Sequence, residues 1–157
     1  MVRWAQGAER IVAMIERDEL QEIPSGVETA LALLEMAERH VEAAGACVDI
    51  DVVGAYAMAY DAARKSATAV LAHQGLRPTT RGGHVAVVDA VEAQFPGVPG
   101  FVSLDRVRRR RNQLEYPDPA RYDAITIEES SEAIAVALAV IDAARTLMGR
   151  RELGLFR

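Results

Sequence analysis

Cysteine, lysine and aromatic residues are scarce in this chain, and each scarcity narrows what the protein can be. The single cysteine, Cys47, excludes an intramolecular disulfide framework and a zinc site built from several cysteines. No histidine or lysine lies near it in the sequence, so we expect an inert, packed thiol. The three histidines show no HxxxH spacing, and we expect neither a metal nor a cofactor. Aromatic residues make up 5% of the 157 residues, so the core must be built from aliphatic side chains and alanine.

Long apolar runs are also missing. No segment reaches the roughly 18–20 consecutive apolar residues that a membrane helix needs, and the first residues lack the apolar stretch of a signal peptide. We therefore expect a soluble, cytoplasmic protein with no membrane partner. The net charge of −5 and the pI of 5.2 exclude a generally basic nucleic-acid coat. With 50% hydrophobic and 26% charged residues, wholesale disorder is excluded as well.

The length favours one domain over residues 1–157. Within it we distinguish an N-terminal helix and turn (1–24), a bundle core (25–150) and a tail (151–157) that we expect to be frayed. Neither a GxGxxG nor a GxxxxGK[ST] pattern is present, so no nucleotide-binding loop is predicted.

Apolar residues at spacings of three and four dominate the chain, and this spacing predicts amphipathic helices rather than strands. Two capping boxes, Ser25 with Glu28 and Thr126 with Glu129, mark helix starts, and Gly75 is placed to end a helix. The second helix should turn Val27, Leu31, Leu34 and Val41 inward. The fold class is therefore all-α: an antiparallel up-and-down bundle of four main helices plus a short N-terminal helix. The predicted helices cover about Arg3–Arg17, Ser25–Ala44, Asp49–Gln74, Gly83–Gln94, Val102–Leu114 and Thr126–Arg150.

The densest charge cluster is the segment LDRVRRRRNQLEYPDP, in which five arginines fall within six positions. A solvated helix face is the ordinary interpretation of such a run. A helical residue advances about 100° around the axis, however, and this places Arg111 on the stripe that carries Leu104, Val107 and Leu114. We therefore expect Arg111 to face the core or an interface, while three other arginines of the run point elsewhere: Arg106, Arg109 and Arg110.

A buried Arg111 needs a counter-charge, because an unpaired buried charge is costly. Glu115, four residues later, is the nearest local partner. Arg108 and Asn112 lie with Glu115 along the edge of the stripe, and Tyr116 stands where Pro117 breaks the helix. Two interpretations stay open: an internal salt bridge, or a site for a bound phosphate.

The residues Arg111-Asn112-Gln113-Leu114-Glu115-Tyr116 resemble the signature of HEPN domains, in which a histidine follows an arginine by four to six positions. The segment Tyr60–His84 is similar to the long second helix and following turn of bacterial HEPN proteins. RNQLEYP is similar to the "R…DY" ending of one HEPN branch, with Glu115 in place of the aspartate. The likeness covers roughly Ser25–Arg150.

This resemblance implies a homodimer that acts on RNA, as a metal-independent endoribonuclease toxin of a bacterial toxin–antitoxin or defence system. Arg111, Asn112 and Tyr116 would be the catalytic residues, with Glu115 orienting the arginine. Tyr116 stands at the position of the family's histidine. Because the pKa of an ordinary tyrosine is near 10, it is a weak proton acceptor at neutral pH, and we expect slow or absent cleavage. The alternative is a catalytically inactive HEPN module that binds RNA, a nucleotide or a nucleotidyltransferase-like antitoxin; a purely structural dimer is a third hypothesis.

Two further sets of residues have alternative interpretations. His84 opens a predicted helix, where it could cap or pack, or could join an anion site and supply the missing base. Tyr56, Tyr60 and Arg64 share one face of the long helix. They form either core with a polar rim or a stacking and phosphate-binding surface that faces the arginine helix.

Overall fold

The computed structural model describes residues 4–24 and 26–157, and it is mostly helical, as the sequence predicts. The Ser25 half of the predicted capping box lies outside the described residues. The elements follow in chain order: α1 (Ala8–Glu16), β1 (Leu20–Glu22), α2 (Val27–Cys47), α3 (Val52–His73), β2 (Leu76–Pro78), α4 (Gly83–Gln94), α5 (Phe101–Glu115) and α6 (Ile127–Met148).

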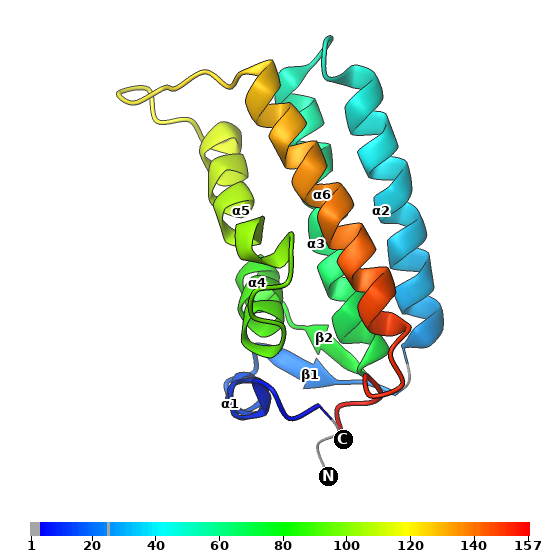
Figure 1. Ribbon diagram of the computed structural model, residues 1–157. Coiled ribbons are helices and arrows are strands. Elements are labelled where there is room, and N and C mark those ends of the chain that lie inside the picture. Colours follow the sequence, from blue (N-terminus) through cyan, green and yellow to red (C-terminus); the bar gives the residue numbers. More distant parts are fainter. Residues whose placement is uncertain (1–3, 25) are drawn as a thin grey trace.

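Helix α3 lies at the centre of the molecule, with α2 and α6 beside it and with α4 and α5 on its other side (Figure 1). Its buried surface consists largely of alanines, among them Ala59, Ala63 and Ala67, which are fully buried. Because helix separation depends on the side chains at the contact, these short side chains let α2 and α6 pack closely on α3. The central helix is therefore in a position to present side chains to α2, α4 and α5.

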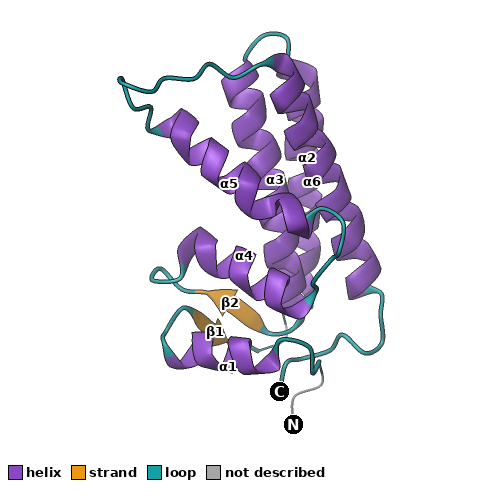
Figure 2. Ribbon diagram, turned by 60° about the vertical axis from the view of Figure 1, so that its left-hand side comes forward, coloured by secondary structure: helices purple, strands orange, loops and turns teal. Residues whose placement is uncertain are grey.

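The segments around residues 20 and 76 form a short antiparallel pair, β1 with β2, where the sequence predicts only turns (Figure 2). Leu20 pairs with Pro78 and Glu22 pairs with Leu76. Strands of three residues are too short to show the alternation by which a strand is recognised. The all-α prediction is thus right for the helices and misses this strand pair.

The C-terminal tail is packed rather than frayed, so the prediction for residues 151–157 is wrong. Leu153 and Phe156 are 2% and 1% exposed. The Phe156 backbone N–H donates to the Gln74 carbonyl at 2.8 Å, and the His73 Nε2 nitrogen donates to the Leu153 carbonyl at 2.9 Å. Two apolar side chains and two hydrogen bonds therefore hold the tail against the end of α3.

The inner stripe predicted for α2 is half wrong. Leu34 and Val41 are buried, but Val27 and Leu31 are 43% and 58% exposed. The buried face instead follows small residues, notably Ala30 and the alanines that come after it at helical spacing. Alanine is only weakly hydrophobic, so a prediction from hydrophobic spacing follows the larger side chains. In α2 this placed the buried face incorrectly.

The helix ends show how local sequence sets the boundaries. Helix α1 begins at Ala8 rather than near Arg3, because Gly7 has a φ of 70°, a left-handed conformation that favours glycine. Gly75 has a φ of 70° after α3, as predicted for a helix-ending glycine. The capping box of Thr126 and Glu129 is confirmed at the start of α6. Within the described residues, no helix has both the length and the apolar character to span a membrane.

Candidate anion-binding site

The candidate site begins with a contact between α3 and the start of α4. The Tyr60 hydroxyl lies 3.0 Å from His84 Nδ1, and the two rings are tilted with centroids 5.8 Å apart. Tyr60 is 2% exposed, whereas His84 is exposed. The tyrosine thus belongs to the core, and its hydroxyl fixes the orientation of a histidine that solvent or a ligand can reach.

Three arginines lie within electrostatic reach of this pair: Arg64 on α3, and Arg108 and Arg111 on α5. Burial lowers the pKa of His84, and the positive charges of these arginines lower it further. Burial also raises the pKa of Tyr60 to about 12, although the same arginines act in the opposite direction. His84 is therefore neutral at pH 7 and Tyr60 remains a phenol.

The position of the His84 proton follows from this contact. A protonated phenol that is buried requires an acceptor, and within residues 4–24 and 26–157 the Tyr60 hydroxyl has only His84 Nδ1. We infer that the hydroxyl donates to Nδ1, so the imidazole proton is on Nε2 of this exposed residue. The exposed side of His84 is then a hydrogen-bond donor, like every nitrogen of the neighbouring guanidinium groups.

Asp61 holds the first of these arginines in place. Its carboxylate accepts hydrogen bonds from Arg64 at 2.5 Å and from Lys65 at 2.6 Å. His40 Nδ1 on α2 also lies 2.7 Å from it, without hydrogen-bond alignment. Burial alone would raise the pKa of Asp61, but the bonds from Lys65 and Arg64 outweigh it and lower the pKa to about 2. The carboxylate is thus firmly ionised at neutral pH.

The positive charge of the cluster exceeds the negative charge that faces it. Arg108 is paired with Asp105 at 2.7 Å, and its side chain is 15% exposed. Arg111 is 28% exposed, and its nearest carboxylate, that of Glu115, is 3.9 Å away, at the limit of an ion pair. The buried Nε of Arg64 has no hydrogen-bond partner among the described residues. Arg111, which is partly exposed and only loosely paired, therefore keeps donors available to an anion, while the buried Nε of Arg64 adds a further donor that is unpaired among the described residues.

The predicted orientation of Arg111 is only partly realised, since the side chain is half-buried beside the Tyr60–His84 pair rather than enclosed. Asn112 is half-buried next to it on α5. Tyr116 lies elsewhere: it is 77% exposed at the end of α5, and it lines a pocket together with Arg110. The structure thus brings Arg64, Arg108, Arg111 and His84 together and leaves Tyr116 apart.

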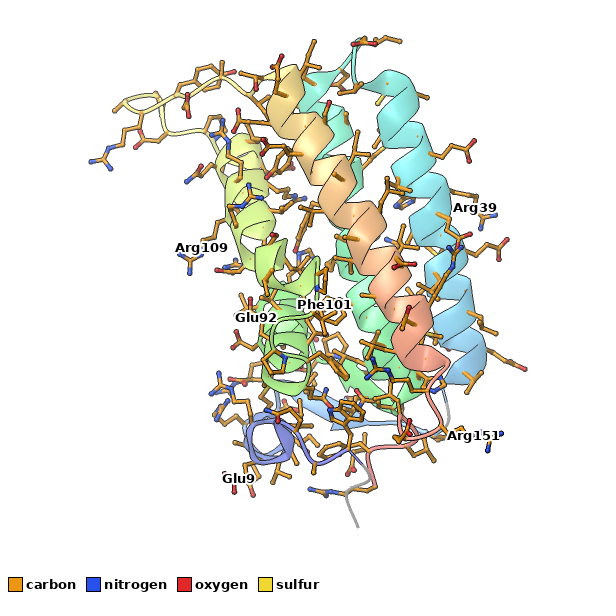
Figure 3. The ribbon with its side chains drawn as sticks, in the orientation of Figure 1. Glu9, Arg39, Glu92, Phe101, Arg109 and Arg151 are labelled. Carbon is orange, nitrogen blue, oxygen red and sulfur yellow. The ribbon has the colours of Figure 1, made fainter. Side chains whose placement is uncertain are left out.

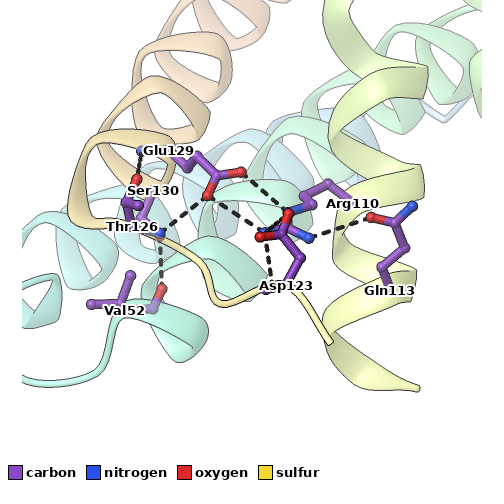
Figure 4. A network of polar contacts seen from close by, with 7 residues as sticks. All are labelled: Val52, Arg110, Gln113, Asp123, Thr126, Glu129 and Ser130. Carbon is purple, nitrogen blue, oxygen red and sulfur yellow. Dashed lines mark hydrogen bonds and ion pairs between the residues drawn. The ribbon is translucent and has the colours of Figure 1, made fainter. Parts of the chain in front are cut away.

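Arg110 has a structural role that the helical phase did not reveal. Its side chain is 15% exposed and is bonded to the Glu129 carboxylate at 3.2 Å and to the Asp123 carbonyl at 3.2 Å (Figure 4). It joins α5 to the following loop and to the start of α6. By contrast, Arg109 is 71% exposed and points away from the bundle, as expected (Figure 3).

Some residues near the site that were not predicted nevertheless show a recognisable spacing in the sequence. Asp61 precedes Arg64 by three positions and Lys65 by four, which is the spacing of helical ion pairs. The Tyr60–His84 contact joins two helices, and no local pattern indicates it. Tyr56 and Tyr60 are both 2% exposed, so the core interpretation of the tyrosines is confirmed, although the Tyr60 hydroxyl reaches the site.

The cluster has the chemistry of an anion receptor. Its exposed groups are guanidinium donors and an imidazole N–H, and guanidinium groups match the geometry of phosphate oxygens. Within residues 4–24 and 26–157, no group of three or more His, Cys, Asp or Glu side chains is arranged to hold a metal ion. No protein-family model, curated protein or solved structure matches this chain.

Proposed function

We propose that this chain is a HEPN-like protein that acts on RNA by binding a backbone phosphate at Arg64, Arg108, Arg111 and His84. The observation that carries the proposal is the convergence of these four side chains, from α3, α4 and α5, around the buried Tyr60 hydroxyl. The HEPN-like bundle, its cytoplasmic location and its action on RNA are parts of the same proposal.

The arrangement favours binding over cleavage in the resting protein. Cleavage without metal requires a base that takes the 2′-hydroxyl proton while O2′ bonds to phosphorus and the bond to O5′ breaks, with a proton delivered to O5′. His84 Nε2 already carries a proton when Tyr60 donates to Nδ1, so it cannot accept another. The site in this state holds a phosphate with donors and leaves the 2′-hydroxyl without a base.

Binding is tested by fluorescence anisotropy with a labelled single-stranded RNA oligonucleotide. Arg111→Ala should weaken binding and reduce the dependence of affinity on salt by about one counterion. Arg109→Ala is the matched control, because Arg109 lies on the same helix but is exposed and points away. Equal affinities for the two variants would contradict the proposed site.

A second candidate function is a metal-independent endoribonuclease, which the closeness of the neutral His84 to Arg111 favours. It requires the other imidazole tautomer, in which Nδ1 donates to Tyr60 and Nε2 accepts the 2′-hydroxyl proton. Total RNA incubated with the pure protein in chelator would then gain 2′,3′-cyclic phosphate ends, and His84→Ala would abolish them. Toxicity on overexpression that Arg111→Ala removes would support a toxin.

The resemblance also predicts partners, which we include in the proposal. A homodimer would place α5 near its two-fold axis, where the arginines of the two copies share counter-charges. Sedimentation that shows a monomer at micromolar concentration would remove the homodimer. An antitoxin of the nucleotidyltransferase kind is tested by co-purification from a strain that expresses both proteins.

A further inference from the structure

The two exposed tyrosines of this chain lie at one pocket. The sequence has three phenylalanines, four tyrosines and one tryptophan. Five of these rings are buried, and Trp4 is half-buried against Phe95. Tyr116 and Tyr122, by contrast, are 77% and 67% exposed, and both line a pocket of about 410 Å³ between the end of α5 and the loop that follows.

The loop that carries these tyrosines contains two hydrogen bonds of its own. The Asp118 carboxylate accepts from the Ala120 N–H at 2.9 Å, and the Arg121 N–H donates to the Asp118 carbonyl at 3.0 Å. Pro117 and Pro119 restrict the backbone further. Order in a free loop reduces the entropy that binding must remove, so these restraints on the backbone favour binding at the two rings.

Arg110 fixes the loop to the bundle. It donates to the Asp123 carbonyl at 3.2 Å and to Glu129 on α6 at 3.2 Å, while its other nitrogen lies 3.4 Å from Gln113 (Figure 4). Gln113 and Arg110 also line the pocket. The tyrosine pocket lies at the C-terminal end of α5, and the arginine cluster includes Arg108 and Arg111 of the same helix, so α5 determines their relative position.

The chemistry of the pocket suits an unpaired nucleobase. Aromatic side chains stack on the faces of splayed bases in single-stranded RNA. Gln113 contributes an amide and Arg121 a guanidinium to the lining, beside the carboxylates of Asp118 and Asp123, and these groups offer both donors and acceptors to the edge of a base. The volume of about 410 Å³ lies within the roughly 300–1,000 Å³ of small-ligand sites.

We propose that Tyr116 and Tyr122 form a base-binding pocket, which holds one unpaired base of the RNA whose phosphate the arginine cluster binds. This inference rests on the proposed function and adds its substrate class, single-stranded RNA. Tyr116 is then a stacking residue for substrate, which explains why the structure places it apart from His84.

The test compares the affinity of the wild type, a Tyr116→Ala/Tyr122→Ala variant and a Tyr116→Phe/Tyr122→Phe variant for a labelled single-stranded RNA. Both alanine changes are at exposed positions, and circular dichroism checks that the variants fold. Loss of the rings should weaken binding by about tenfold or more, whereas the phenylalanine variant keeps the rings and should bind like the wild type. An oligonucleotide with abasic positions should bind the wild type more weakly than the intact oligonucleotide does. It should bind the wild type and the alanine variant with equal affinity.

The outcomes separate the pocket from the phosphate site. If the alanine variant binds like the wild type while Arg111→Ala weakens binding, the pocket proposal is wrong and the proposed function stands. If only the tyrosine changes weaken binding, the pocket stands and the arginine cluster does not bind RNA. Failure of the wild type to bind any RNA overturns both. Equal affinity of the wild type and the alanine variant for a free nucleoside monophosphate would also overturn the base pocket. Altered self-association of the alanine variant with unchanged RNA affinity would overturn it as well.

Discussion

The replacement Asp61→Asn should lower the stability of the protein and tighten anion binding at the same time. Asp61 is the shared counter-ion of Arg64 and Lys65, which bond to it at 2.5 and 2.6 Å. A carboxyl whose pKa falls from 3.8 to about 2 on folding stabilises the folded state by about 2 kcal/mol at neutral pH. The amide keeps the shape but removes the charge, so two half-buried cations lose their counter-ion.

The stability effect has a defined pH window. Because the pKa of Asp61 is lowered on folding, its stabilisation is fully present above about pH 4 and is lost as the pH falls towards 2. Urea unfolding at pH 7 should show a loss of about 2 kcal/mol for Asp61→Asn, and the gap from the wild type should narrow below pH 4.

Glu35→Gln is the matched control for this change, because Glu35 and Arg39 form an ion pair whose side chains are 68% and 64% exposed. It should change stability by less than about 0.5 kcal/mol. The binding effect is measured by calorimetry with inorganic phosphate, for which Asp61→Asn should have the higher affinity, since Arg64 is then released. Unchanged stability together with unchanged phosphate affinity would refute the role assigned to Asp61.

Three further predictions concern other parts of the structure. Arg110→Ala should lower the free energy of unfolding, measured in urea, by about 1–2 kcal/mol, because the bonds to the loop and α6 are lost. Arg109→Ala should lower it by less than about 0.5 kcal/mol. The opposite order would contradict the assigned contacts. Phe156→Ala should cost about 3 kcal/mol or more by the same measurement, and Leu155→Ala, at a position that is 36% exposed, should cost less; a neutral Phe156→Ala would mean that the tail is not packed. RNA affinity should rise as the pH falls below about 6.5 and through the lowered pKa of His84, because protonation adds a positive charge to the site. Fluorescence anisotropy at several pH values checks this. The pH dependence should vanish in His84→Gln.

The helices were predictable because their signals are local. A few adjacent residues are enough to indicate each of three helix ends: the start of α4 at Gly83, the capping box of α6 and the glycine after α3. The β1–β2 pair and the packed tail depend on partners far apart in the sequence, such as Leu20 with Pro78. No periodicity within either segment indicates such a partner, so both were missed.

The candidate site was predictable to the same extent. Arg64, Arg108, Arg111 and His84 could be selected as residues with phosphate-binding chemistry, but their convergence required the packing of α3 against α4 and α5. The helical phase of α5 correctly turned Arg110 away from the core stripe, but it did not indicate that Arg110 is buried against the loop and the start of α6. The hydrophobic stripe reports only the core side of a helix, and it carries no information about a loop that folds back on the opposite side.

The most direct test of the anion site is an NMR titration of the histidine side chains with a short single-stranded RNA. In the free protein, the nitrogen shifts of His84 should report a neutral ring with its proton on Nε2, the tautomer in which the Tyr60 hydroxyl donates to Nδ1. Added RNA should shift the His84 resonances and raise its pKa, while His73, which is bonded to the Leu153 carbonyl, should stay unchanged. RNA that binds without moving the His84 resonances would contradict the central claim, because the phosphate would then lie elsewhere on the protein.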